Sequence, residues 1–289
     1  MTEFVVQTIN GLTLAGVIFL VSSGFTLIFG VMRVTSLAHG AIFLLGGYVA
    51  YSVVQHLHNF FWGLAAGTVA MGALGLVIER GLLPLLRHSE MAELLATLGL
   101  VYVIDDVSLA IWGGNPLNIT LPGVLNASTT LPYNGIVYPN DRFFVLGVAV
   151  AVAIGLYVML RRTRIGAIIR AGVDDREMVS ALGINVRVVF SAVFVLGTAL
   201  AGFAGVLGVP IVGLATGNDT TILLLALAVV VIGGLGSYEG AILGSLIIGL
   251  ADVYGTAYFP SVSYSVLFIP LVVILLVRPQ GLLGRKAAI

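Results

Sequence analysis

The chain has 289 residues, of which 59% are hydrophobic and only 9% are charged, and its mean hydropathy is +1.13. A soluble domain carries roughly 25% charged residues, so a chain this poor in charge could not cover its own surface in water. The composition excludes an ordinary soluble domain. It predicts an all-α integral membrane protein with roughly eight to ten spans of about 20 apolar residues each.

Charge and residue usage exclude several other classes. The formal net charge is zero, which gives no sign of a nucleic-acid partner. Cysteine is absent, so disulfides, thiolate metal sites and cysteine nucleophiles are excluded. The only lysine is Lys286, and no Gly-Lys-Ser/Thr sequence is present, so the chain lacks a Walker A loop for ATP. We therefore expect a protein that is not itself an enzyme and holds no cofactor or metal.

Apolar runs follow one another along the whole chain, which predicts one transmembrane domain over residues 1–289 with eight or nine spans. The segment Met1–Asn10 has no basic residue of the kind a signal peptide carries, so we expect the first run to be a retained helix. In chain order the runs are Gly11–Val31, Leu37–Val54, Phe60–Ile78, Met91–Trp112, Phe143–Leu160, Val188–Val212, Thr221–Leu235, Ala241–Ala257 and Tyr264–Val277.

Two of these runs, Thr221–Leu235 and Tyr264–Val277, are short for a perpendicular span. Glycines Gly233, Gly234 and Gly236 break the chain after the first of them. Residues 221–257 are thus either two spans or a re-entrant pair, and irregular backbone at membrane depth survives only inside protein or beside a wet cavity. The many glycines within the runs indicate closely packed, broken helices of the kind transporters use.

The distribution of arginines among the loops predicts the orientation of the chain in the membrane. Loop 161–187 is rich in them, the tail carries Arg278, Arg285 and Lys286, and loop 113–142 carries only Arg142. Since positive residues stay cytoplasmic, loop 161–187 and the C-terminus are predicted inside. Loop 113–142 and the N-terminus are predicted outside. Arg33, Arg80 and Arg87 also fit the inside.

Within loop 161–187 the pattern predicts a short helix over about residues 175–182. Asp174 could cap it, with Glu177 three residues later as in a capping box, and Gly183 would end it. Met178, Ala181 and Leu182 would share one apolar face. Such a helix in a cytoplasmic loop is either an ordinary solvated segment or a docking element for a soluble partner.

The stretch 170–185 (RAGVDDREMVSALGIN) resembles the coupling loop of ABC importer permeases for branched-chain amino acids, the LivH type. Other stretches of the same family agree in order along nearly the whole chain. They are residues 10–14 (NGLTL), 38–40 (AHG), 197–207 (GTALAGFAGVL), 233–237 (GGLGS) and 278–284 (RPQGLLG).

The resemblance implies a division of labour. The chain would pair with a second, usually related permease subunit, two cytoplasmic ATPases holding ATP and Mg²⁺ would dock on the coupling loops, and an extracytoplasmic binding protein would deliver the solute. The setting would be a bacterial or archaeal cell membrane. The resemblance assigns ATPase coupling to Arg170, Asp174, Asp175, Glu177, Met178, Ala181, Leu182 and Gly183.

Two stretches depart from the commonest family pattern. Ser36 and Leu37 stand where Asn-Phe is frequent, and Tyr238 and Glu239 stand where an uncharged pair is frequent. Because family members also carry urea, amides and other amino acids, these departures leave the solute open while the transport class stands.

Polar residues inside the apolar runs are candidates for a translocation path. Ser22, Ser23 and Thr26 lie in the first run, and His39 begins the second near the predicted inner surface. Hydroxyls can also bond to the preceding turn, and a lone histidine is more often structural. An intramembrane enzyme using Ser23 and His39 is a remote alternative, because the two are expected at different depths.

Asp105 and Asp106 lie within the fourth run, where carboxylates are costly and often functional. They could face outer water or a subunit interface. They could also relay protons, which would make the chain a proton-coupled secondary transporter instead. His56 and His58 have no third ligand nearby, so no metal site is predicted.

Overall fold

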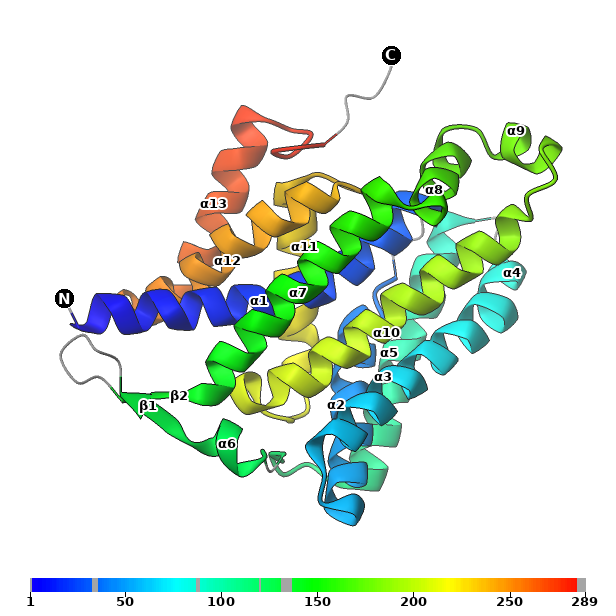
Figure 1. The fold of residues 1–289 in the computed structure, drawn as a ribbon. Helices are drawn as coiled ribbons and strands as arrows, with labels where there is room; N and C mark the ends of the chain where they lie inside the picture. The colour runs from blue at the N-terminus through cyan, green and yellow to red at the C-terminus, as the bar shows by residue number, and fades with distance from the viewer. Residues whose placement is uncertain (1, 33–35, 87–88, 120, 131–136, 285–289) are drawn as a thin grey trace.

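The computed structural model describes residues 2–32, 36–86, 89–119, 121–130 and 137–284 (Figure 1). Arg33, Arg87, Arg285, Lys286 and the turn-forming residues 131–135 lie outside these ranges. Within the described residues the chain is almost entirely helical, which confirms the predicted all-α class.

Each predicted apolar run corresponds to a helix, and seven of the described helices are long and apolar enough to cross a membrane. The helices in these runs are α1 (Thr2–Met32), α2 (His39–Leu57), α3 (Phe60–Val77), α5 (Glu90–Trp112), α7 (Asn140–Arg162), α10 (Val186–Val212), α11 (Asn218–Gly233), α12 (Tyr238–Tyr258) and α13 (Ser263–Val277). Two of these, α11 and α13, are the short ones, as expected from their runs.

Shorter elements join the long helices. A π-helical turn (Ile78–Leu82) and α4 (Leu83–Leu86) continue α3, and a 3₁₀ turn (Pro260–Val262) precedes α13. The loop 113–142 holds α6 (Gly123–Asn126) and an antiparallel hairpin of β1 (Ser128–Thr130) and β2 (Val137–Pro139), with Thr129 opposite Tyr138. The loop 161–187 holds α8 (Arg164–Asp174) and α9 (Arg176–Ala181).

Helix α1 runs through the centre of the bundle and is buried along most of its length (Figure 1). It packs against α7, α10, α11 and α12, while α10 also packs against α2 and α3. Glycine permits these crossings. A Cβ at Gly205 of α10 would overlap the carbonyl oxygen of Phe43 in α2, and one at Gly24 of α1 would overlap that of Gly197 in α10. Glycines at these crossings are thus packing residues, as small residues in membrane helices generally are.

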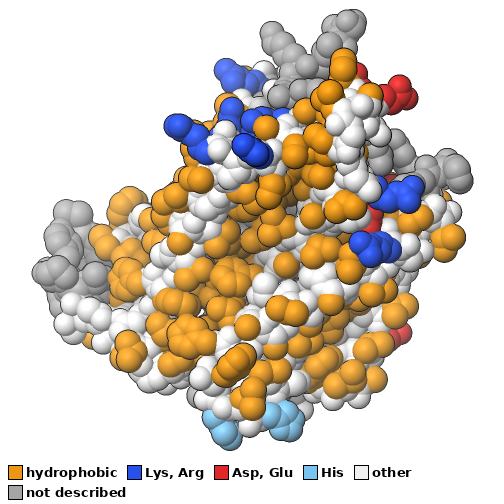
Figure 2. Space-filling model, turned by 45° about the vertical axis from the view of Figure 1, so that its right-hand side comes forward, with side chains coloured by type: hydrophobic (Ala, Val, Ile, Leu, Met, Phe, Trp, Pro, Cys, Tyr) orange, Lys and Arg blue, Asp and Glu red, His pale blue; other side chains and the backbone are white. Residues whose placement is uncertain are grey.

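The bundle has two distinct ends. Helices α1 and α12 run antiparallel, since Gly11 packs against Leu250 at one end and Gly30 against Gly236 at the other. The end that holds Gly30 also carries α8, α9 and the start of α10, and we call it the arginine-rich end. Its described arginines are Arg80, Arg161, Arg162, Arg164, Arg170, Arg187 and Arg278. Figure 2 shows arginines gathered at one end of the face, His at the other, and a broad hydrophobic surface between them.

Helices α5 and α7 are the most exposed of the long helices. Their outward apolar side chains include Tyr102, Val103 and Ile111 on α5 and Val150 and Ile154 on α7. An apolar surface of this extent requires lipid or another membrane subunit as its environment.

Candidate functional site

The loop 161–187 folds into two helices where the sequence predicted one. Helix α8 was not predicted, because its arginines suggested a solvated loop. In the structure its Ile169 is buried, and Ile168 and Val173 are half-buried. Thr163 caps it by accepting from the N–H of Gly166 (3.2 Å). Arg170 donates to the carbonyl of Leu160, which ties α8 to the end of α7.

The capping prediction for the second helix is corrected by one residue. Asp175, not Asp174, is the N-cap of α9, and its carboxylate accepts from the N–H of Met178 (2.9 Å). An N-cap needs extended backbone, which Asp175 has (φ −149°, ψ 99°), whereas Asp174 is the last residue of α8 and its side chain lies outside the described ones. Glu177 therefore falls one position short of a capping box.

Helix α9 presents an exposed apolar face at the arginine-rich end. Met178 is 62% exposed and Leu182 is 73% exposed, and Ala181 and Glu177 are exposed beside them. Val179 is buried and anchors the helix to the bundle. Gly183 follows with φ +80° and ends the helix as predicted. A short capped helix, anchored on one side and apolar on the other, is suited to docking a soluble partner.

A cavity of about 460 Å³ opens at the same end. Its polar lining comes from Thr26 in α1, Arg161 in α7, Arg170 in α8 and Glu239 in α12. Arg161 donates to Glu239 across the mouth (Nη2 to Oε1, 2.5 Å), joining the end of α7 to the start of α12. The cavity thus borders both α8 and the C-terminal part of α1.

The predicted path residues of α1 are all buried, but they differ in their bonding. Ser22 donates to the carbonyl of Phe19 (3.3 Å) and Ser23 to that of Leu20 (2.9 Å), which is the bonding to the preceding turn left open above. Thr26, one turn beyond Ser22, has a buried hydroxyl without a hydrogen-bond partner and lines the cavity.

His39 lies deeper than predicted. Its ring is fully buried against α1, edge-on to Phe25 (centroids 5.7 Å apart) and next to Gly24. Gly24 precedes the end of α1 by eight residues, or about 12 Å along the helix axis. The chain therefore returns into the bundle after α1 before α2 begins. Ser23 and His39 are thus not separated in depth as expected, although the Ser23 hydroxyl is engaged by Leu20.

Helix α11 also begins inside the bundle. The turn before it contains Leu214, which packs on Gly47 in α2 and pairs with Leu117 of loop 113–142, called the outer loop after its predicted location. The carbonyl of Asp219, in the first turn of α11, abuts Gly40 in the first turn of α2. Two helices thus start at one point within the bundle and run in opposite directions from it.

The predicted glycine break lies at the other end of α11. The helix ends at Gly233, Gly234 and Gly236 have positive φ (97° and 77°), and α12 begins at Tyr238. Leu282 and Leu283 donate their N–H groups to the carbonyls of Ile232 and Gly233, so the segment after α13 covers this end. Residues 221–257 therefore lie in two helices, the short α11 of 16 residues and α12, which at 21 residues is long enough to cross a membrane.

Two carboxylates from different helices lie near the start of α11, and the sequence alone did not predict that they would lie together. Asp219 is 2% exposed, and its charge interacts with that of Asp105 on α5, the partly buried residue predicted as a candidate. Asp106 is exposed. Asp219 falls just before the predicted run at Thr221, and only the contact with Gly40 shows that this position is internal.

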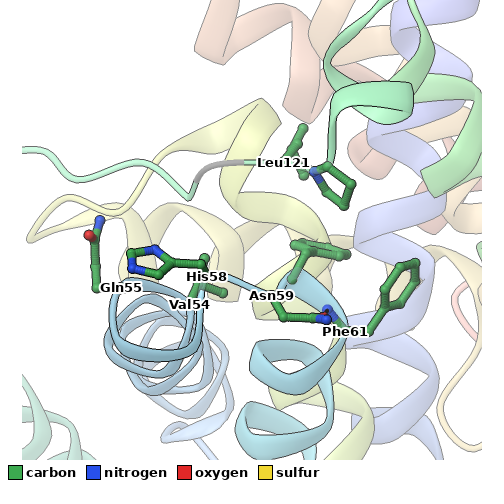
Figure 3. Close-up of a pocket in the computed structure, with 8 residues that line it drawn as sticks. Val54, Gln55, His58, Asn59, Phe61 and Leu121 are labelled. Atoms are coloured by element: carbon green, nitrogen blue, oxygen red, sulfur yellow. Dashed lines mark hydrogen bonds between the residues drawn. The ribbon is translucent and has the colours of Figure 1, made fainter.

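The opposite end holds a smaller pocket of about 280 Å³ between the α2–α3 turn and the outer loop (Figure 3). Its wall includes His58, Asn59, Phe61 and Leu121. Asn59 accepts from the N–H of Phe61 (2.9 Å), so its side chain caps α3. Among the described residues, no three His, Asp or Glu side chains gather as metal ligands would.

The hairpin of the outer loop is tied to the start of α1. Tyr138 donates to Asn10 (2.7 Å), and Arg142 donates to the same oxygen. Burial raises the pKa of Tyr138, and the nearby Arg142 opposes that change. These bonds hold β2 and the start of α7 against α1.

Helices that begin inside an apolar bundle, together with an exposed apolar helix face at one end, are typical of a multi-pass membrane transport protein. The sequence matches the family described as "Branched-chain amino acid transport system / permease component" over residues 7–277. The chain belongs to this family of transport permeases.

Curated relatives agree over nearly the full length. The high-affinity branched-chain amino acid transport system permease protein BraD of Pseudomonas aeruginosa is 30% identical, with 98% of this chain and 96% of the relative covered. The corresponding protein LivH of Escherichia coli is also 30% identical with the same coverage. The permease protein LivM of Escherichia coli is 27% identical over 96% of this chain and 70% of its own. No solved structure matches the chain.

Proposed function

We propose that this chain is a membrane permease subunit of an ABC importer, which moves a small solute inward with energy from ATP hydrolysis on partner subunits. The solute we propose is a branched-chain or related amino acid, as the names of BraD and LivH state for those relatives. One observation carries the coupling role. Met178 and Leu182 form an exposed apolar face on a capped helix at the arginine-rich end.

The proposed partners are a second permease subunit, two cytoplasmic ATPases and an extracytoplasmic solute-binding protein. ATP and Mg²⁺ would be bound by the ATPases. The similarity to both LivH and LivM supports a related but non-identical second permease, because two permease proteins of Escherichia coli resemble this one chain.

The proposed setting is a bacterial or archaeal cell membrane, with the N-terminus outside and the C-terminus in the cytoplasm. The described arginines support this orientation, since they cluster at the end that holds α8, α9 and Arg278. Positive residues are retained on the cytoplasmic side.

The proposed mechanism uses the α8–α9 segment as a rigid lever. Arg170 bonds to the end of α7, Val179 is packed in the core, and α10 follows directly. A force on α9 would therefore reach both α7 and α10. ATP-dependent contacts at α9 would bias the permease pair between outward-open and inward-open states. The residues proposed to form or hold the docking surface are Arg170, Asp174, Asp175, Glu177, Met178, Ala181, Leu182 and Gly183.

The test is retention of an ATPase by the tagged chain after mild solubilisation from its native membrane. We expect the wild type to retain an ATPase, and we expect Glu177→Lys and Met178→Asp each to abolish retention. Val124→Asp is the matched control, because Val124 is 79% exposed at the opposite end. If the wild type retains no ATPase under conditions that preserve a known importer, the proposal is wrong. Proton-coupled transport through Asp105 or Asp106 then becomes the leading hypothesis.

A further inference from the structure

The meeting point of α2 and α11 is polar although it lies inside the bundle. Both helices lack a side-chain cap at their N-terminus, since neither Ala38 nor Gly217 provides one. Asn218 donates to the carbonyls of Val212 and Gly213. Because α2 and α11 run in opposite directions, their first-turn N–H groups point to opposite sides of this meeting point, and those of α11 point toward the part of α2 that holds Gly47 and Tyr48.

Buried oxygen atoms without partners surround this region. Oδ1 of Asp219, Oδ1 of Asp105 and Oγ of Ser108 have no hydrogen-bond partner. Asp219 and Ser108 are 2% and 4% exposed. Ser108 follows Asp105 by one helical turn, so both lie on the same side of α5. Unpaired polar groups buried at this depth are costly, which indicates that a ligand meets them during the working cycle.

The charge of the region specifies the ligand. Asp105 and Asp219 lie close enough for their charges to interact. The charges of both also interact with the phenol group of Tyr48 in α2. Among the described residues, neither carboxylate forms a salt bridge with Lys or Arg. Two carboxylates without a basic partner attract a cation. A metal ion would need further ligands, and no described His, Asp or Glu supplies a third.

Aromatic side chains complete the surroundings. The ring of Tyr48 is buried and stacks on Trp112 of α5 (centroids 5.0 Å apart), and the indole N–H of Trp112 donates to Ser52 (2.7 Å). Aromatic faces favour ammonium groups. The uncapped N-terminus of α11, in turn, favours a carboxylate. A site that favours an ammonium group next to one that favours a carboxylate matches the two charged groups of an amino-acid zwitterion.

We propose that Asp105 and Asp219 form a station on the translocation path that binds the α-ammonium group of the transported amino acid. The station lies beside the start of α11 and Tyr48 of α2. This inference rests on the proposed function, because it assumes that an amino acid passes through the chain. It adds residues on α5 and α11 to the path, neither of which belongs to the serine, threonine and histidine set predicted from α1 and α2.

The absence of cysteine from the chain allows a direct test. Thr216 is exposed, two residues before α11 begins, and approaches Tyr48. In the purified complex, Thr216→Cys is treated with a cationic (MTSET) and an anionic (MTSES) thiosulfonate, and modification of this chain is followed by mass spectrometry. Rates are normalised to those of Asn126→Cys in the exposed outer loop. We expect the cationic reagent to be favoured by about tenfold.

Charge-removing variants show which carboxylates cause the preference. Asp219→Asn and Asp105→Asn, each combined with Thr216→Cys, should reduce the preference severalfold. Asp252→Asn, a half-buried carboxylate in α12, should leave it unchanged. Preference that persists in both variants would overturn the assignment of these two residues.

Protection experiments identify the group that binds. Leucine and 3-methylbutylamine, which carry an ammonium group, should slow modification of Thr216→Cys. The deaminated analogue 4-methylpentanoate should not. Equal protection by 4-methylpentanoate, or protection by none of the three, would overturn the proposal. ATP-driven uptake by the wild-type complex is measured alongside. Its absence contradicts the proposed function, whereas uptake without protection contradicts only the station.

Discussion

Gly205 fixes how closely α10 approaches α2. A Cβ at this position would overlap the carbonyl oxygen of Phe43, and backbone cannot move aside as a flexible side chain can. The sequence predicted close packing from the glycines in this run. It could not say which glycine faces which helix, because that depends on how the two helices cross.

Replacing Gly205 with valine should therefore destabilise the bundle by about 3 kcal/mol. The matched control is Gly155→Val in α7, where an added Cβ would meet no atom within 4 Å, and whose effect should stay within about 0.5 kcal/mol. Denaturant unfolding of the two variants in detergent measures both. Equal stability of the two would contradict the crossing at Gly205.

At positions 174 and 175 the sequence predicted the kind of cap but not the residue. Two adjacent aspartates are equally good N-cap candidates by sequence. The structure distinguishes them because α8 runs through Asp174 and leaves only Asp175 extended. The extent of the preceding helix, α8, therefore decides which aspartate caps α9. Sequence did not predict α8, because arginines interrupt its apolar positions.

At the scale of the element, α9 is six residues long and cannot persist on propensity alone. Removing its cap with Asp175→Ala should cost about 1 kcal/mol and speed amide exchange in residues 176–182 about fivefold. ATPase retention should weaken with it. Asp175→Asn keeps an acceptor for the Met178 N–H and should restore both. If exchange is unchanged in the alanine variant, then packing of Val179 alone holds the helix.

The starts of α2 and α11 show what sequence could not supply at this scale. Apolar runs located both helices to within a few residues. Nothing local marked their N-termini as internal, because the return of the chain into the bundle is a tertiary event seen in the contacts of Gly40 with Asp219 and of His39 with α1. This also explains why His39 was expected near the surface and why Asp219 was not considered for the path.

At the scale of the whole molecule, the two ends differ in charge, and this difference predicts the orientation in the membrane. The described arginines lie at the end of α8 and α9 with one clear exception, Arg142, which bonds to Asn10 at the other end. Cytoplasmic retention of positive residues then places α9 inside and the hairpin β1–β2 outside. The assignment does not depend on counting spans, which a short helix such as the 16-residue α11 would have made unreliable.

Labelling with a membrane-impermeant maleimide tests this orientation, and the cysteine-free parent chain provides an unlabelled background. Ala127→Cys lies in the exposed outer loop, and Ser180→Cys is exposed on α9. In spheroplasts we expect Ala127→Cys to react at once and Ser180→Cys to react only after permeabilisation. The reverse pattern would place α9 outside, where no ATPase could reach it, and the coupling role of α9 would then be lost together with the orientation.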